Sequence, residues 1–262
     1  MDEEIVRLTQ RCLAEVIKET ARRCGGDLIE QDGLLLVAGN HPCPVLLNSA
    51  LRTGTMDATE ALRRAEAFFG ERRHRYETWT REGADADLEK AALAAGMHLA
   101  AELSGMVLHR SPDVPKSRPD VEVRRVEDMD GVQDFINVAA EGFRDETPCL
   151  YELVRATFSD PRSILAPDTV AFVVWNRGEP VSTALTMVKE GIAWIGWVAT
   201  LPGARGRGLG RIATAAATQE GFALGAAFAS LEATRMGVTL YSKLGYREVL
   251  RYRNYWPADF LG

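Results

Sequence analysis

The chain has 262 residues, of which 46% are apolar and 26% charged, as in a globular protein of one or two domains. Its net charge of −6 argues against a general nucleic-acid binder, and it has no apolar run of the ~20 residues that cross a bilayer. The Met-Asp-Glu-Glu start lacks the basic end and apolar core of a signal peptide. We therefore expect a cytoplasmic monomer or homodimer that binds neither nucleic acid nor a membrane.

The four cysteines are scattered along the chain, at Cys12, Cys24, Cys43 and Cys149. They form no close pairs and no clusters with histidine. At this chain length we expect them to be reduced thiols, with neither a disulfide framework nor a metal site.

The first half alternates helical and extended patterns. In chain order these predict a helix at residues 5–21, strands at 27–30, 34–38 and 45–47, a helix at 57–69, a strand at 76–80, a helix at 87–95 and an extended segment at 99–109. Asp57 and Glu60 have the spacing of an N-cap and the third helical position, so the second helix is expected to begin at Asp57.

A proline-rich stretch follows. Residues 111–119 read S-P-D-V-P-K-S-R-P, with three prolines in nine positions. Proline fixes φ and cannot join the interior of a sheet. We therefore divide the chain into a first domain at 1–112, a linker at 113–120 and a second domain at 121–262.

The second half predicts a mixed sheet. In chain order its patterns indicate a strand at 121–126, helices at 128–143 and 151–158, strands at 170–175, 180–188 and 192–200, a helix at 208–224, a strand at 228–233, a helix at 238–244 and a strand at 247–255. The three consecutive strands are expected to form an antiparallel meander. This order predicts an α+β fold with helices on both faces of the sheet.

The third strand of the meander leads into a glycine-rich loop and then an alanine-rich helix. Residues 198–213 read V-A-T-L-P-G-A-R-G-R-G-L-G-R-I-A. Glycine N–H groups before a helix N-terminus form an anion site. The interleaved arginines suggest a ligand with more than one phosphate.

The pattern Arg205-x-x-Gly208-x-Gly210, followed by Tyr241-x-x-Leu244-Gly245-Tyr246, resembles the GNAT superfamily of acetyl-CoA-dependent N-acyltransferases. The resemblance covers residues 121–255. It implies a mixed, mostly antiparallel sheet flanked by helices. It also implies acetyl-CoA as acyl donor, coenzyme A as product, no metal, and an amine of a small molecule or peptide as acceptor.

The resemblance also assigns cofactor contacts. The loop that would wrap the pyrophosphate comprises Arg205, Gly206, Arg207, Gly208, Leu209, Gly210 and Arg211. The preceding segment Val198, Ala199 and Thr200 resembles the family's bulged strand, which pairs with the pantetheine arm. There the Val198 N–H would stabilise the thioester oxygen.

Two further positions follow from the same resemblance. Tyr241 takes the place of the tyrosine that protonates the departing thiolate, and its phenol is protonated at neutral pH. Thr234 stands where the family often has an asparagine that contacts the cofactor. The general base is left open between Glu232 and Glu141, and some members use none.

The first half looks like a degenerate copy of the second. Both halves end in a helix, a glycine and a strand, at Gly96 and Gly245. The first half has only one glycine in Arg52-Thr53-Gly54-Thr55 and no counterpart of Tyr241, so we expect one active site per chain. The alternative is an unrelated α+β domain.

Two other functions are kept as alternatives. One is a module that binds acetyl-CoA without turnover. The other is an NAD(P)-binding oxidoreductase, because Gly208-x-Gly210-x-x-Ala213 satisfies the dinucleotide fingerprint and Glu232 lies about 20 residues further on. The hairpins before the glycines argue against that second alternative.

Overall fold

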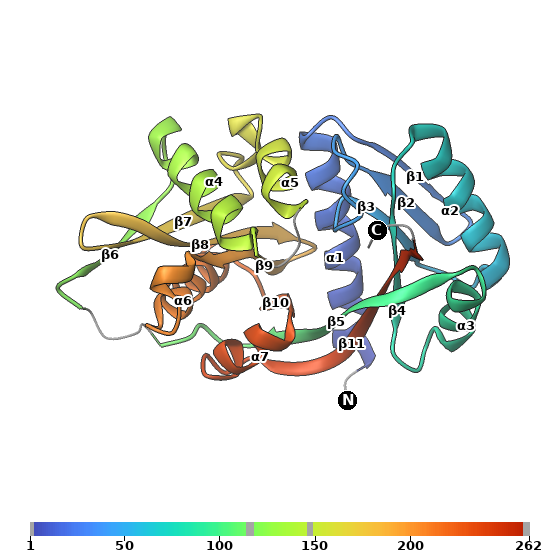
Figure 1. Cartoon of the computed structure of the whole chain (residues 1–262). Helices are drawn as coiled ribbons and strands as arrows, with labels where there is room; N and C mark the ends of the chain where they lie inside the picture. The colour runs from blue at the N-terminus through green and yellow to red at the C-terminus, as the bar shows by residue number, and fades with distance from the viewer. Residues whose placement is uncertain (1–2, 114–117, 146–148, 259–262) are drawn as a thin grey trace.

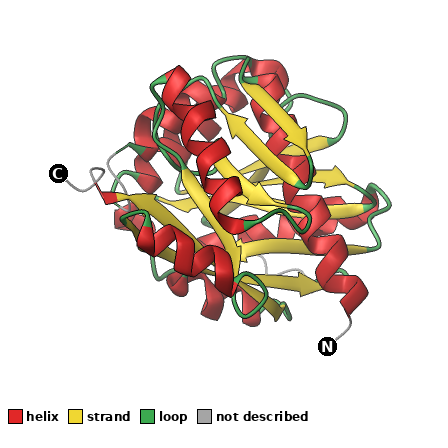
Figure 2. Cartoon of the chain, turned by 90° about the vertical axis from the view of Figure 1, so that its right-hand side faces the viewer, coloured by secondary structure: helices red, strands yellow, loops and turns green. Residues whose placement is uncertain are grey.

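One continuous sheet runs through the whole molecule, with helices on both of its faces (Figure 1, Figure 2). The computed structural model describes residues 3–113, 118–145 and 149–258. Within these residues the sheet has 11 strands in the order β1-β2-β3-β4-β11-β5-β10-β9-β8-β7-β6. The α+β fold expected from the sequence is confirmed. Part of the expected linker, residues 114–117, lies outside the described residues.

The first half contributes the following elements: α1 (Glu3–Arg23), β1 (Asp27–Gln31), β2 (Leu34–Ala38), β3 (Asn48–Arg52), α2 (Ala58–Arg72), β4 (Glu77–Arg81), α3 (Ala86–Ala94) and β5 (Met97–Leu108). The Asp57 side chain accepts hydrogen bonds from the Thr59 and Glu60 N–H groups, which confirms the predicted start of α2.

The strand expected at 45–47 is wrong. These residues form a turn, in which Leu46 has a φ of 54° and the Leu47 N–H donates to the Val45 carbonyl. A left-handed residue interrupts the regular extended backbone, and here pairing starts only at Asn48.

The second half contributes β6 (Val121–Arg125), α4 (Met129–Phe143), α5 (Leu150–Thr157), the 3₁₀ turn η1 (Pro161–Ser163), β7 (Thr169–Asn176), β8 (Glu179–Lys189), β9 (Ile192–Thr200), the 3₁₀ turn η2 (Pro202–Ala204), α6 (Leu209–Ala223), β10 (Phe228–Ala233), α7 (Arg235–Ser242) and β11 (Arg247–Pro257). Strands β7, β8 and β9 form the expected antiparallel meander, and β10 runs parallel to β9.

The last strand of each half pairs with the other half. Strand β11 lies between β4 and β5, and β5 lies between β11 and β10. The two exchanged strands are antiparallel, from Arg247 opposite Val107 to Pro257 opposite Met97. Each half is therefore closed by a strand that the other half supplies.

The two halves repeat one arrangement. In the first half β3 and β4 are parallel with α2 between them in sequence, as β9 and β10 are with α6. Helix α1 packs at the junction of the halves (Figure 1), where its Cys12 and Val16 share a core with Phe135 of α4 and Trp194 of β9. Helix α6 covers the opposite face. Any site at the junction is therefore built from both halves.

Candidate active site

A cavity of about 800 Å³ lies where the two halves meet. Its walls come from β9, β10, the glycine loop and α7 of the second half, from β4, β5 and the turn at residues 45–46 of the first half, and from the exchanged strand β11. The sequence-predicted residues that line it are Val198, Ala199, Thr200, Arg205, Gly206, Gly208, Leu209, Gly210, Arg211, Thr234 and Tyr241. Arg207 is not among the lining residues.

The cavity starts where β9 and β10 separate. The two strands pair only from Ile192 to Trp194 of β9, although β9 continues to Thr200. A bulge then interrupts the ladder between β8 and β9. Trp197 there has a φ of 52°, and its carbonyl accepts a hydrogen bond of 3.0 Å from the Thr183 Oγ1. The bulge expected from the sequence is thus present, and it leaves backbone groups of β9 facing the opening.

The glycine loop leads from β9 into α6. Gly206 and Gly208 have φ values of 74° and 78°, a backbone conformation that costs glycine little and other residues more. The first backbone hydrogen bond at this end of α6 runs from the Ile212 N–H to the Gly208 carbonyl. The N–H groups of the preceding residues therefore point out of the helix end, where they can bind an anion.

The three arginines of the loop take different positions. Arg205 donates from Nε to the Thr200 carbonyl at 3.1 Å and from Nη2 to the Gly142 carbonyl at 2.7 Å, which ties the loop to the end of α4. Arg207 donates to the Asn176 Oδ1 at 3.3 Å, on β7. Arg211 is exposed at the rim of the cavity. The loop geometry thus uses Arg205 as a brace, while Arg211 adds positive charge at the helix end.

Tyr241 is held by α7 on the wall of the cavity. Its side chain is buried and packs edge-on against Tyr246, with ring centroids 6.1 Å apart. A Cβ at Gly237 would lie 2.7 Å from the Tyr241 ring, so the missing side chain at that position makes room for the ring. Thr234 is the N-cap residue of α7, and its side chain makes no capping hydrogen bond.

Glu232 and Glu141, the two candidate bases, differ in environment. Glu232 lines the cavity from β10, and its Oε2 accepts a hydrogen bond of 2.7 Å from the Trp194 Nε1. Its Oε1 is buried without a hydrogen-bond partner among the described residues. Burial raises the pKa of Glu232 to about 7. Glu141 is exposed, pairs with Arg144, and is not among the cavity-lining residues.

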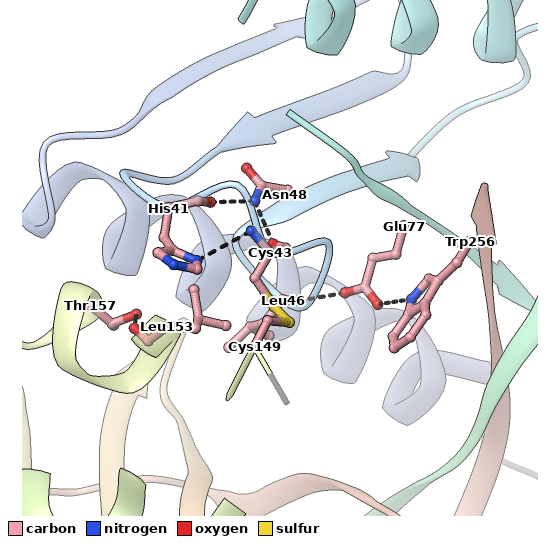
Figure 3. Close-up of a disulfide and its surroundings, with 9 residues drawn as sticks. All are labelled: His41, Cys43, Leu46, Asn48, Glu77, Cys149, Leu153, Thr157 and Trp256. Carbon is pink, nitrogen blue, oxygen red and sulfur yellow. Dashed lines mark hydrogen bonds between the residues drawn. A yellow bond between two sulfur atoms is a disulfide. The ribbon is translucent and has the colours of Figure 1, made fainter. Parts of the chain in front are cut away.

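The opposite end of the cavity contains residues that the sequence did not single out. Glu77 of β4 is 2% exposed and accepts hydrogen bonds from the Leu46 N–H at 2.6 Å and the Trp256 Nε1 at 3.3 Å (Figure 3). It also accepts hydrogen bonds from the Trp79 Nε1 at 2.8 Å and the Asn254 Nδ2 at 2.8 Å. Both Asn254 and Trp256 lie on the exchanged strand β11. Only the pairing of β11 with the first half brings this set together, so no local pattern could have revealed it.

The expectation that all four cysteines are reduced is wrong. Cys43 and Cys149 form a disulfide that joins the turn before β3 to the start of α5, across 106 positions of sequence (Figure 3). The neighbouring residues Val45, Leu46, Leu150 and Leu153 line the cavity. Cys12 and Cys24 are buried thiols. The disulfide therefore lies beside the end of the cavity that contains Glu77.

The matching place in the first half is filled by ion pairs. Arg52, at the end of β3, donates to Asp85 at 2.7 Å and to Asp87 at 2.6 Å, at the start of α3. Asp85 also binds Arg81 at 2.6 Å, and the Arg52 and Asp85 side chains are buried. Arg52 and Arg81 lie just beyond the residues at which β3 and β4 pair, as the opening between β9 and β10 lies beyond the paired residues of those strands.

No three or more histidine, cysteine or acidic side chains among the described residues are grouped so that they could hold a metal ion. None of the described helices combines the length and the apolar character needed to cross a membrane.

Comparison with known proteins adds a family match. Residues 133–246 match the model of the acetyltransferase (GNAT) family. No curated protein sequence gives a significant match.

Solved structures share the fold over most of the chain. A GCN5-related N-acetyltransferase from Kribbella flavida is 19% identical with a TM-score of 0.72, covering 94% of this chain and 95% of its own. One from Sphaerobacter thermophilus is 17% identical with a TM-score of 0.63, covering 88% and 75%. A tandem GNAT protein from the clavulanic acid biosynthesis pathway is 12% identical with a TM-score of 0.59, covering 88% and 78%.

Proposed function

We propose that the protein is an N-acetyltransferase, because residues 133–246 match the model of the acetyltransferase (GNAT) family and the fold is similar to that of a tandem GNAT protein. It moves the acetyl group of acetyl-CoA to a primary amine by direct attack within a ternary complex. The observation that carries the proposal is one cavity bordered by the splayed strands β9 and β10, by the N-terminus of α6 and by Tyr241.

The proposed roles of the backbone groups follow from the negative charges on the cofactor and on the reacting thioester. The diphosphate of acetyl-CoA binds the N–H groups at Gly206, Gly208 and the start of α6, and the pantetheine arm pairs with Val198 and Thr200. The bulge leaves the Val198 N–H available to the thioester oxygen, where negative charge grows during attack.

The proton transfers use two side chains of the cavity. Glu232 takes the proton that the amine loses, because its unpartnered Oε1 can accept it and its pKa of about 7 suits a base at neutral pH. The neutral amine nitrogen passes this proton to Glu232 as it bonds to the acetyl carbon, the carbon–sulfur bond breaks, and the leaving thiolate takes a proton from the Tyr241 hydroxyl.

We place one active site in each chain. The ion pairs between Arg52 and the acidic pair Asp85 and Asp87 occupy the region where a pantetheine arm would lie in the first half. This supports a degenerate first copy whose remaining role is to build the acceptor end of the cavity through β4 and β5.

The test has two stages. In thermal unfolding, acetyl-CoA at 100 times its Kd should stabilise the full chain by about 2.7 kcal/mol, and NAD should not. Tyr241→Phe should then lower the rate of acetyl transfer by about 100-fold with acetyl-CoA binding unchanged. Tyr151→Phe, on α5 outside the cavity lining, is the matched control. Stabilisation by NAD alone would overturn the proposal, and binding of acetyl-CoA without turnover of any amine would identify a binding module.

A further inference from the structure

The lining of the cavity is rich in tryptophan. The chain has five tryptophans, and four of them line this cavity: Trp79, Trp194, Trp197 and Trp256. They come from β4, β9 and β11, so the wall is shared by both halves. Large aromatic faces bind flat rings and attract cations.

Three of these tryptophans have their indole N–H groups engaged by carboxylates. The indole N–H groups of Trp79 and Trp256 donate to Glu77, and that of Trp194 donates to Glu232. These three donors are therefore bonded to the protein's own carboxylates, and what the three side chains present to a ligand in the cavity is apolar ring surface rather than a free N–H group.

Two hydrogen-bond acceptors on the same wall are unsatisfied. Within the described residues, the Glu232 Oε1 and the Asn254 Oδ1 are buried without a partner, and Asn254 is 2% exposed. The Asn254 Nδ2 is already bound to Glu77 at 2.8 Å, which fixes the direction of its oxygen. A buried acceptor without a donor is costly, so a ligand that brings N–H or O–H groups would remove that cost.

Charge divides the cavity into two ends. Its basic lining residues, within the described chain, are Arg205 of the glycine loop, Arg211 at the start of α6 and Lys243 just after α7. The other end carries the carboxyl groups of Glu77 and Glu232. An acceptor carboxylate would find no cation among the described lining residues at this end, whereas an ammonium group would be attracted to Glu232 once that side chain is ionised, above its pKa of about 7.

We propose that the acceptor is an arylalkylamine: a primary amine with an aromatic body and no carboxylate. Its amine lies at Glu232, its ring lies among the faces of Trp79, Trp197 and Trp256, and a donor on the ring binds the Asn254 Oδ1. The inference rests on the proposed acetyl transfer for the reaction, but the binding preference itself does not require turnover.

The experiment compares matched ligands on the full chain. Tyramine, phenethylamine and tyrosine are titrated without acyl donor and followed by tryptophan fluorescence, and acetyl transfer to each is then measured with acetyl-CoA. Tyramine should bind about 100-fold more tightly than tyrosine, because the two differ only in the carboxylate. It should bind about 10-fold more tightly than phenethylamine, because of the phenol donor to Asn254.

Two variants assign these preferences to residues. Glu232→Gln keeps a hydrogen-bond acceptor for the Trp194 N–H but loses the negative charge. It should therefore reduce the preference for tyramine over tyrosine, measured as the ratio of their binding affinities, by about 10-fold. Asn254→Ala should make tyramine and phenethylamine equal. Glu141→Gln, which removes an exposed carboxylate outside the cavity lining, should change neither ratio. If Asn254→Ala does not fold, the wild-type ligand comparison decides alone.

The outcomes separate the two proposals. Binding of tyramine in preference to tyrosine without acetyl transfer would support the acceptor site and overturn the proposed function. Acetyl transfer to tyrosine as fast as to tyramine would support the proposed function and overturn the arylalkylamine. Equal binding of all three ligands would also overturn it.

Discussion

Glu232 is the residue whose environment best explains its proposed role. Its neighbours across the sheet include Cys12 of α1 and Tyr252 of β11, and both are uncharged at neutral pH. Burial, together with the charge of Glu232, raises the pKa of Cys12 to about 12, and burial likewise raises that of Tyr252. The Trp194 N–H stabilises the carboxylate, but burial outweighs it. The result is an acid that changes its charge near neutral pH.

We therefore predict that titration of Glu232 controls the rate of the reaction near pH 7. A base must be deprotonated, so the rate of acetyl transfer in the wild type should rise with pH through a midpoint near 7 and level off at higher pH. In Glu232→Gln the rate should fall by about 100-fold, and the limb near pH 7 should disappear. The measurement is kcat/KM for one amine from pH 5 to 9, with Glu141→Gln expected to keep the wild-type profile.

Stability provides a check on Glu232 that is independent of turnover. Its pKa in the folded protein, about 7, lies above the ordinary value of 4.5, so the folded state keeps this proton longer than the unfolded state does. Ionisation therefore destabilises the wild type between pH 4.5 and 7. Glu232→Gln should melt a few degrees higher than the wild type at pH 8 and at the same temperature below pH 4.5. A constant difference across this range would contradict the raised pKa.

Among the elements, the glycine loop was predictable because its requirements are local. The chain must pass from β9 into α6 with left-handed residues and with main-chain N–H groups uncovered, and the sequence supplies Gly206 and Gly208 at those positions. The meander before it was equally predictable, because its turn residues are local signals in the sequence. The turn at residues 45–47 was not, because its left-handed Leu46 is held by a hydrogen bond to Glu77 of another strand.

A substitution at Gly208 tests whether this loop contributes to acetyl-CoA binding apart from its effect on the stability of the fold. Gly208→Ala puts a side chain on a residue with a φ of 78°, which should destabilise the fold by about 1 kcal/mol. The displaced N–H groups should also weaken acetyl-CoA binding by about 10-fold, the value of one hydrogen bond to a charged group. Calorimetric titration and thermal unfolding measure the two effects.

Gly178 offers a matched control, because it has a φ of 84° and equally open surroundings but lies in the turn between β7 and β8. Gly178→Ala should cost the same stability and leave acetyl-CoA binding unchanged. Equal loss of binding in both variants would show that the loop acts only through stability.

For the molecule as a whole, the sequence indicated two similar halves but not how they join. Each half ends in a helix, a glycine and a strand, and this pattern is the same whether the strand pairs within its own half or with the other. The exchange of β5 and β11 is decided by long-range pairing. It also explains why the glycine loop and Tyr241 could be found in advance, whereas Glu77, Asn254 and Trp256 could not.

The disulfide was missed for a related reason. Cys43 and Cys149 are 106 residues apart and have no spacing motif, so only the packing of the two halves shows that their Cα atoms lie 5.8 Å apart. It joins the turn that carries Val45 and Leu46 to the start of α5, and both segments border the acceptor end of the cavity. A covalent bond at this place should therefore affect both the stability of the molecule and the shape of that end.

Reduction of this bond should destabilise the protein and weaken the binding of the amine more than that of acetyl-CoA. Opening a loop of about 100 residues removes about 5 kcal/mol of unfolded-state restraint. Thiol titration in denaturant should find two thiols before reduction and four after it. The Cys43→Ala, Cys149→Ala double variant should match the reduced protein, with a raised KM for the amine and an unchanged KM for acetyl-CoA. Cys24→Ala, which removes a buried thiol without touching the bridge, should keep the wild-type KM values.

Four thiols before reduction would refute the bridge, and equal changes in both KM values would show that it does not act on the acceptor end.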